Sequence, residues 1–278
     1  MMPLRRMVKA RDSRVAYFRN VPVLVYHKVQ PGIELGVTTV HPRVFRKHLQ
    51  WIRQQQFTPI TFQTLITSPE SRLPAKPIII SFDDGFASVA EYAFPVMQEA
   101  QIPGVVFAIS GFLGKRGVWD VNLGSRAPLH LSGEQLRSLV QRGWEIGSHT
   151  VTHRALPFLN TAELKEELDA SRRHLEDTIG GPVQTIAYPF GLTNSRVLRA
   201  SQRAGYIFAT GSPFLSHWKG QPIVFPRIPV FPWDTPGTLK KKIAAPHALT
   251  YQIITRIIRW PAVFSPIYQL LFRRFLWK

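Results

Sequence analysis

The chain of 278 residues contains no cysteine. This absence excludes a disulfide framework and a thiolate metal site, so any metal ion must be held by His, Asp or Glu. No run of 18 or more apolar residues is present, and we therefore expect no membrane-spanning helix of the ordinary kind. Residues 1–20 carry six Arg or Lys but no following apolar segment with a cleavage site, so a secretory signal is not expected.

Acidic residues are scarce in this sequence. The 17 Asp and Glu are outnumbered by 35 Lys and Arg, which gives a formal net charge of +18. An excess of this size implies an anionic partner, and three classes fit: nucleic acid, an anionic membrane surface, or an anionic substrate.

The rest of the sequence is organised around residues 77–85. The β-branched run from Ile78 to Ile80 follows a proline and indicates a buried strand of a parallel sheet. The strand leads into Asp83 and Asp84, and ligands in α/β folds bind at the carboxyl ends of such strands. Because adjacent residues of an extended chain point to opposite sides, we expect the two carboxylates to have different roles. The alternative is a solvated Asp-Asp-Gly turn.

Strand-like and helical patterns alternate along the chain, with polar residues at the strand ends. This alternation predicts an α/β fold with a parallel sheet or barrel. Residues 111–130 contain four Gly and one Pro and are expected to form a loop over the end of the sheet. The expected strands are residues 21–27, 77–82, 104–110, 144–148, 183–188 and 206–210, and the expected helices are residues 41–56, 86–100, 132–142, 161–178 and 195–204.

Two imidazoles, His149 and His153, stand four residues apart just past an expected strand. If this segment is helical, both side chains lie on one face at a distance suited to chelation. With one of the carboxylates after residue 82, the set becomes two His and one Asp, which leaves positions on a metal ion for water and substrate. The other carboxylate could take a proton from the water. Ordinary core or surface histidines are the alternative.

Three segments carry a family resemblance. Residues 81–85 (Ser-Phe-Asp-Asp-Gly), 149–153 (His-Thr-Val-Thr-His) and 187–191 (Ala-Tyr-Pro-Phe-Gly) resemble, in order and separation, the first three motifs of the polysaccharide deacetylases. This family is also called carbohydrate esterase family 4 or the NodB-homology domain. The strand end at residues 25–27 resembles the branch that includes biofilm-glucosamine deacetylases. The resemblance covers about residues 21–230.

The resemblance implies a distorted (β/α)7 barrel that holds one divalent metal ion, usually zinc. Asp84, His149 and His153 would be the metal ligands, and Asp83 would be the general base. A metal-activated water would attack the carbonyl carbon of an N-acetyl group on an amino-sugar glycan or glycolipid.

The resemblance also assigns residues around the ligands. The metal and the backbone N–H of Phe190 would hold the oxyanion, and His27 and Tyr188 would line the substrate site. The motifs do not separate an amide from an ester, so an O-acetyl carbohydrate esterase on the same fold is one alternative. A catalytically inactive basic binding protein is another, and the intact ligand set and general base argue against it.

The sequence departs from the family pattern at the arginine that steadies the base, and it leaves the general acid unassigned. Many members carry an arginine two residues before the motif proline, where this chain has Ala187. We expect Arg227 to take over the role of steadying Asp83, the alternative being a surface arginine. In typical members a late Leu-x-His motif supplies the general acid; here the general acid is left unassigned, and neither His217 nor His247 is given that role. Asp83 itself could return its proton to the amine.

The sequence divides into a basic arm at residues 1–20, the barrel domain at residues 21–245 with a motif core at about 76–230, and a tail at residues 246–278. After Asp234 the chain has eight Lys or Arg and no acidic residue, with apolar side chains at helical spacing. This pattern favours a helix in an anionic membrane interface, so we expect a cytoplasmic protein held peripherally on the inner membrane face. The alternative is a helix that closes the barrel. Nucleic acid is not expected as a partner, because no known nucleic-acid module is present.

Overall fold

The structure is a computed structural model, and it describes residues 17–18, 21–32, 37–117, 127–211 and 223–245. The predicted tail at residues 246–278, and all of the predicted arm at residues 1–20 except residues 17 and 18, lie outside the described residues. The strands and helices named below lie between Val23 and Ala244.

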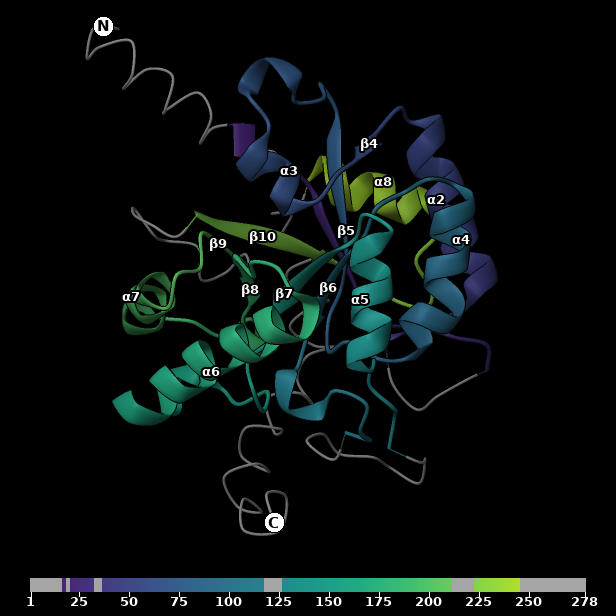
Figure 1. The fold of residues 1–278 in the computed structure, drawn as a ribbon. Helices are drawn as coiled ribbons and strands as arrows, with labels where there is room; N and C mark the ends of the chain where they lie inside the picture. Colours follow the sequence, from purple (N-terminus) through teal and green to yellow (C-terminus); the bar gives the residue numbers. More distant parts are fainter. Residues whose placement is uncertain (1–16, 19–20, 33–36, 118–126, 212–222, 246–278) are drawn as a thin grey trace, which may run out of the picture.

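Seven parallel strands close into a barrel (Figure 1). Around the barrel they follow the order of the sequence, and the last strand pairs with the first. A short strand, β4 (Thr58–Pro59), is attached outside the ring at the start of the second barrel strand. The predicted (β/α)7 barrel is therefore confirmed. Its strands are β1 (Val23–Tyr26), β5 (Pro77–Phe82), β6 (Val105–Ala108), β7 (Glu145–Ser148), β8 (Thr185–Ala187), β9 (Phe208–Gly211) and β10 (Ile223–Pro229).

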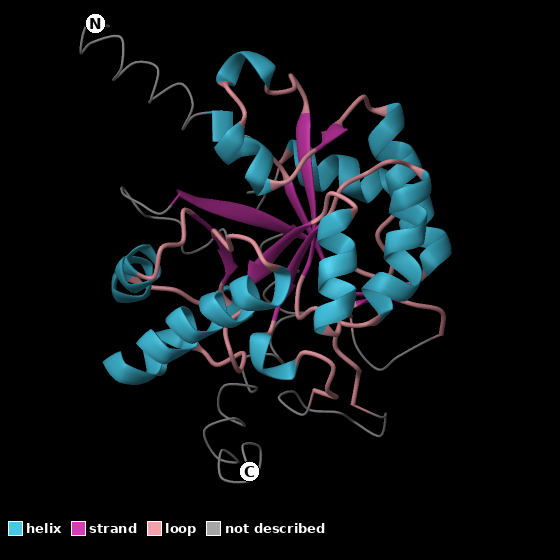
Figure 2. Cartoon of the chain, viewed as in Figure 1, coloured by secondary structure: helices cyan, strands magenta, loops and turns pink. Residues whose placement is uncertain are grey.

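Helices surround the barrel on the outside (Figure 2). Among the described residues, no helix combines the length and the apolar character needed to cross a membrane. The helices are α2 (Pro42–Gln54), α3 (Phe62–Thr67), α4 (Phe94–Glu99) preceded by a π-helix (Val89–Ala93), α5 (Gly133–Gln141), α6 (Thr161–Ile179), α7 (Ser195–Arg203) and α8 (Pro236–Ala244). Four 3-10 turns (Glu70–Arg72, Ser110–Phe112, Leu156–Phe158 and Pro189–Gly191) and a small pair of strands, β2 (Lys28–Val29) and β3 (Thr39–Val40), complete the described elements.

Among the barrel strands and the α-helices, α3, β10 and α8 were not predicted. Helix α3 has six residues, too few to show helical periodicity, and it begins at a capping box of Thr61 with Thr64. Strand β10 contains Pro226 and Pro229, and proline argues against a strand because it cannot donate to the ladder. The strand nevertheless pairs with both β9 and β1, so barrel closure outweighs the local preference.

The alternation of side chains along the strands determines what the barrel interior contains. Ile79 and Phe225 belong to a cluster of buried apolar side chains inside the barrel. Phe62 of α3 belongs to the same cluster and closes the amino end of the barrel. Because strand side chains alternate, Asp83, four residues after Ile79, and Arg227, two residues after Phe225, also face the interior. They do so at the carboxyl end of the strands, where ligands bind in α/β barrels.

Candidate metal centre

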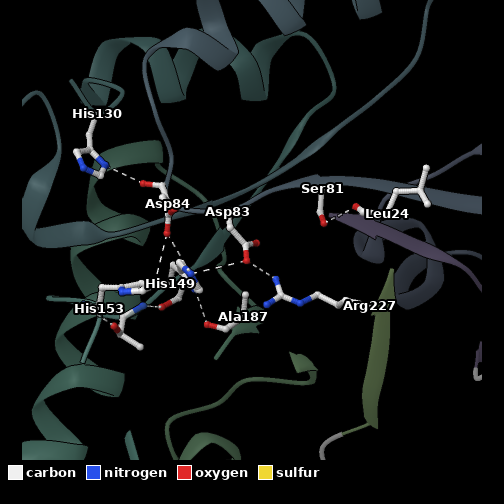
Figure 3. A network of polar contacts seen from close by, with 11 residues as sticks. Leu24, Ser81, Asp83, Asp84, His130, His149, His153, Ala187 and Arg227 are labelled. Carbon is white, nitrogen blue, oxygen red and sulfur yellow. Dashed lines mark hydrogen bonds and ion pairs between the residues drawn. The ribbon is translucent and has the colours of Figure 1, made fainter. Parts of the chain in front are cut away.

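Three buried side chains converge at the carboxyl end of the barrel. Asp84 lies in the turn after β5, His149 follows β7 directly, and His153 comes four residues later. Asp84 Oδ1 is 3.4 Å from His149 Nε2 and 3.5 Å from His153 Nε2 (Figure 3). These three residues form a group whose ligand atoms could together hold a metal ion. The structure thus brings together the three predicted ligands.

The hydrogen bonding around these atoms fits a cation at their centre. His149 Nδ1 donates to the backbone oxygen of Ala187 at 2.7 Å, so in the neutral imidazole Nε2 presents a lone pair to Asp84 Oδ1. Two acceptors therefore face each other, and within the described part of the chain Asp84 Oδ1 has no hydrogen-bond donor. A tetrahedral ion with bonds of 2.0–2.1 Å would hold its ligand atoms about 3.4 Å apart. The observed separations match that value.

The shifts in the pKa values of the three residues also favour a cation at their centre. Burial raises the pKa of Asp84, but the imidazoles of His149, His153 and His27 outweigh this and hold it well below its usual value. Burial and the neighbouring His149 lower the pKa of His153, which keeps its imidazole neutral. Burial also lowers the pKa of His149, but Asp83 and Asp84 outweigh this and raise it. The carboxylates thus favour a positive charge beside His149, which a metal ion would supply.

The second carboxylate, Asp83, forms an ion pair with Arg227. Arg227 Nη1 donates to Asp83 Oδ2 at 2.5 Å, and the side chains are only 11% and 3% exposed. Asp83 Oδ2 is also 3.8 Å from His149 Nε2. The backbone is not extended at Asp84, whose φ is +67°, so both carboxylates approach His149. The prediction that they point to opposite sides was therefore wrong, although their partners differ.

The segment that carries the two histidines is not helical. Thr150 and His153 have φ values of +69° and +57°, and hydrogen bonds within the loop hold this bend. Glu167 of α6 accepts hydrogen bonds from the backbone N–H groups of Val151 and Thr152. The spacing of four residues therefore brings the imidazoles together through a strained loop, with ring centroids 4.7 Å apart, and the helical interpretation was wrong.

The remaining predicted residues lie around this centre in different ways. The ring of Phe190 packs on His153 with centroids 4.7 Å apart, and the φ of Phe190 is +57°. His27 is half-buried after β1, and it lies close enough to influence Asp84 and His153 electrostatically. Tyr188 has no exposed surface and its hydroxyl donates to Ser201 Oγ, so it packs in the core; its contact with substrate stays a prediction. His217 and His247 lie outside the described residues.

Two residues at the site were missed from the sequence, Glu167 and His130. Glu167 stands beside Leu168 on the buried face of α6, and a carboxylate on an apolar helix face was a readable signal. His130 is buried, and its Nδ1 donates to the backbone oxygen of Asp84 at 2.8 Å. It is the last residue of the segment 111–130 that was predicted as a loop, and no sequence pattern marked it.

Comparisons with known proteins give a consistent result. A family model described as polysaccharide deacetylase matches residues 70–209. The chain is 26% identical over 226 residues to the poly-β-1,6-N-acetyl-D-glucosamine N-deacetylase of Staphylococcus epidermidis. This match covers 73% of this chain and 76% of that protein. A polysaccharide deacetylase structure from Bacillus cereus is 26% identical with a TM-score of 0.65, over 80% of this chain and 68% of that one. The Streptococcus pyogenes deacetylase PplD, solved with acetate, shares the fold at 21% identity with a TM-score of 0.66, over 80% and 97% of the two chains. The span matched by the family model contains both Asp and both His of the centre, while His27 and Arg227 lie outside it.

Proposed function

Because this chain belongs to the polysaccharide deacetylase family, we propose that it is a metal-dependent hydrolase that removes N-acetyl groups from an amino-sugar glycan or glycolipid. The observation that carries the proposal is the buried set of Asp84, His149 and His153, whose acceptor atoms face one another at the spacing of metal ligands. The Staphylococcus epidermidis relative is named as an N-deacetylase, which favours an amide over an ester as the substrate.

Zinc is the ion that we propose for this set, because two imidazoles and one carboxylate are a donor set that zinc accepts in catalytic sites. When bound, a divalent ion would lower the pKa of a water and polarise the acetyl carbonyl. Three protein ligands leave room for water and substrate beside them.

The proton transfers are proposed for Asp83. Arg227 holds Oδ2 of this carboxylate, while Oδ1 has no hydrogen-bond donor among the described residues and is left to accept the proton of the attacking water. The water oxygen bonds to the acetyl carbon. Asp83 then passes its proton to the nitrogen as the bond from that carbon to nitrogen breaks. A free amino sugar and acetic acid leave, and the acid gives up its proton to become acetate. We propose that the backbone N–H of Phe190 stabilises the oxyanion and that His27 lines the substrate.

The experiment is a product analysis of the metal-loaded full chain. It is incubated with β-1,6-linked N-acetylglucosamine oligomers and, in parallel, with O-acetylated oligosaccharides, and acetate and free amine are measured. Equal amounts of acetate and amine from the first substrate are expected. Acetate from the second substrate alone would point to an esterase, and no acetate from either, with metal bound, would point to a binding protein.

We also propose that the protein is held on the cytoplasmic face of the membrane through residues 246–278. Support for this location comes from the sequence pattern of cations and apolar residues alone, because the segment lies outside the described residues.

A further inference from the structure

The metal ligand Asp84 lies in an unusual turn. Both Asp84 and Gly85 have left-handed backbone conformations, with φ values of +67° and +66°. This region is costly for a residue with a side chain, so the surrounding structure must hold Asp84 in it. A side chain at Gly85 would be crowded, because a Cβ would lie 3.2 Å from the Cα of Ala108. The turn directs the carboxylate of Asp84 toward His149 and its backbone oxygen the other way (Figure 3).

The segment 129–131 binds this turn at three points. Leu131 N donates to the oxygen of Gly85, and Ala87 N donates to the oxygen of Leu129, each at 2.8 Å. The third bond comes from a side chain: His130 Nδ1 donates to the backbone oxygen of Asp84 at 2.8 Å. Because the acceptor is a carbonyl oxygen, this nitrogen must carry the proton. His130 is thus the side chain that holds the backbone of the ligand itself.

The imidazole of His130 is itself fixed in place. It is 1% exposed, and its ring lies between Phe86 and Phe112, with centroid distances of 5.0 and 5.5 Å. The backbone N–H of His130 donates to the oxygen of Lys115 at 2.9 Å. A ring packed on both sides and anchored through its backbone can keep a neighbouring carbonyl in one direction.

We propose that His130 is a positioning residue of the metal centre, which keeps Asp84 in the left-handed turn that presents its carboxylate to the metal. The inference rests on the part of the proposed function that concerns metal binding, and it assigns His130 no contact with the metal or the substrate. The competing explanation is that His130 only fills space between two aromatic rings.

Two substitutions separate the hydrogen bond from the packing. His130→Phe keeps a ring between Phe86 and Phe112 but removes the N–H donor. His130→Asn loses the ring but keeps an N–H donor near the position of Nδ1, and His130→Ala loses both. The control is His174→Phe, because His174 is exposed on α6.

The measurements are the Kd for Co²⁺ and Zn²⁺ by competition with a chromophoric chelator, the visible spectrum of the Co²⁺ form, and the Tm of the metal-free protein. We expect His130→Phe to weaken binding by about 10–100-fold and to change the Co²⁺ spectrum, as loss of a residue that orients a ligand typically does. His130→Asn should bind more tightly than His130→Ala, and the control should match the wild type.

A wild-type Kd and spectrum in His130→Phe would overturn the proposal, as would equal affinities of His130→Asn and His130→Ala. The second comparison still decides the matter if His130→Phe folds poorly. Metal binding by the wild type without release of acetate would refute the proposed function and leave this inference standing. Absence of metal binding by the wild type would overturn both.

Discussion

Replacing His153 with alanine should weaken metal binding by more than about a hundredfold, because removal of a residue that only orients a ligand already costs about 10–100-fold. The substitution removes one of the three donor atoms, the one 3.5 Å from Asp84 Oδ1. It also removes the ring that packs on Phe190 and His149. The loss of packing lowers the stability of the metal-free and metal-bound forms alike. The effect on binding is therefore measured by how much more stable the protein becomes when the metal is added.

The size of that difference follows from linkage. At a metal concentration of about a thousand times the wild-type Kd, binding stabilises the folded chain by about 4.1 kcal/mol, whereas a hundredfold weaker site gains only about 1.4 kcal/mol. The difference of about 2.7 kcal/mol should reduce the metal-induced rise in Tm by roughly 5–11 °C for a chain of this size.

The assay combines elemental analysis with thermal unfolding, with and without zinc. His174→Ala, an exposed change on α6, is the control for the removal of an imidazole and should behave as the wild type. Full metal content in His153→Ala, with an unchanged rise in Tm, would refute the ligand assignment.

Four further results are expected. Asp83→Asn should keep the metal and lose about 10²–10⁴-fold in turnover, since a general base is removed; near-normal turnover would exclude that role. Arg227→Met leaves Asp83 buried without its partner and should lower the free energy of unfolding by about 3–5 kcal/mol, as well as turnover; unchanged urea unfolding and kcat would contradict this. Burial raises the pKa of Glu145 from 4.5 to about 7, although the hydrogen bonds that its carboxylate accepts act to lower it. Between these two pH values the folded state therefore keeps a proton that the unfolded state loses. Stability should therefore fall as the pH rises from 4.5 to 7, and Glu145→Gln should gain up to roughly 3 kcal/mol over the wild type across that range; a difference independent of pH in urea unfolding would show the reasoning wrong. Deletion of residues 246–278 should release the protein from anionic vesicles and leave metal binding intact, whereas aggregation with loss of metal would show that the tail packs on the barrel.

Several features of the site and fold could be predicted because they depend on residues close together in the chain. The β-branched run before Asp83 forms β5, and the capping box of Ser132 with Gln135 begins α5. The resemblance of three short motifs to the polysaccharide deacetylases implied the barrel and the set of Asp84, His149 and His153, which the structure brings together. Elements with weak local patterns were missed, namely a helix of six residues, a strand with two prolines, and α8. In these elements long-range packing outweighs local preference.

The sequence by itself determined where strands end and which polar residues follow them, because the alternation of side chains along a strand and the residue preferences of turns depend on residues a few positions apart. Only the tertiary structure decided the geometry in which those groups meet. Arg227 reaches Asp83 across 144 residues, because closure of β10 on β1 places both inside the barrel. The left-handed conformations of Asp84 and His153 bring the carboxylate and the imidazole together, and they are held by His130 and by the loop around Thr150. Backbone conformations of this kind are costly for residues other than glycine, so they arise from the surrounding contacts and leave no mark in residue spacing.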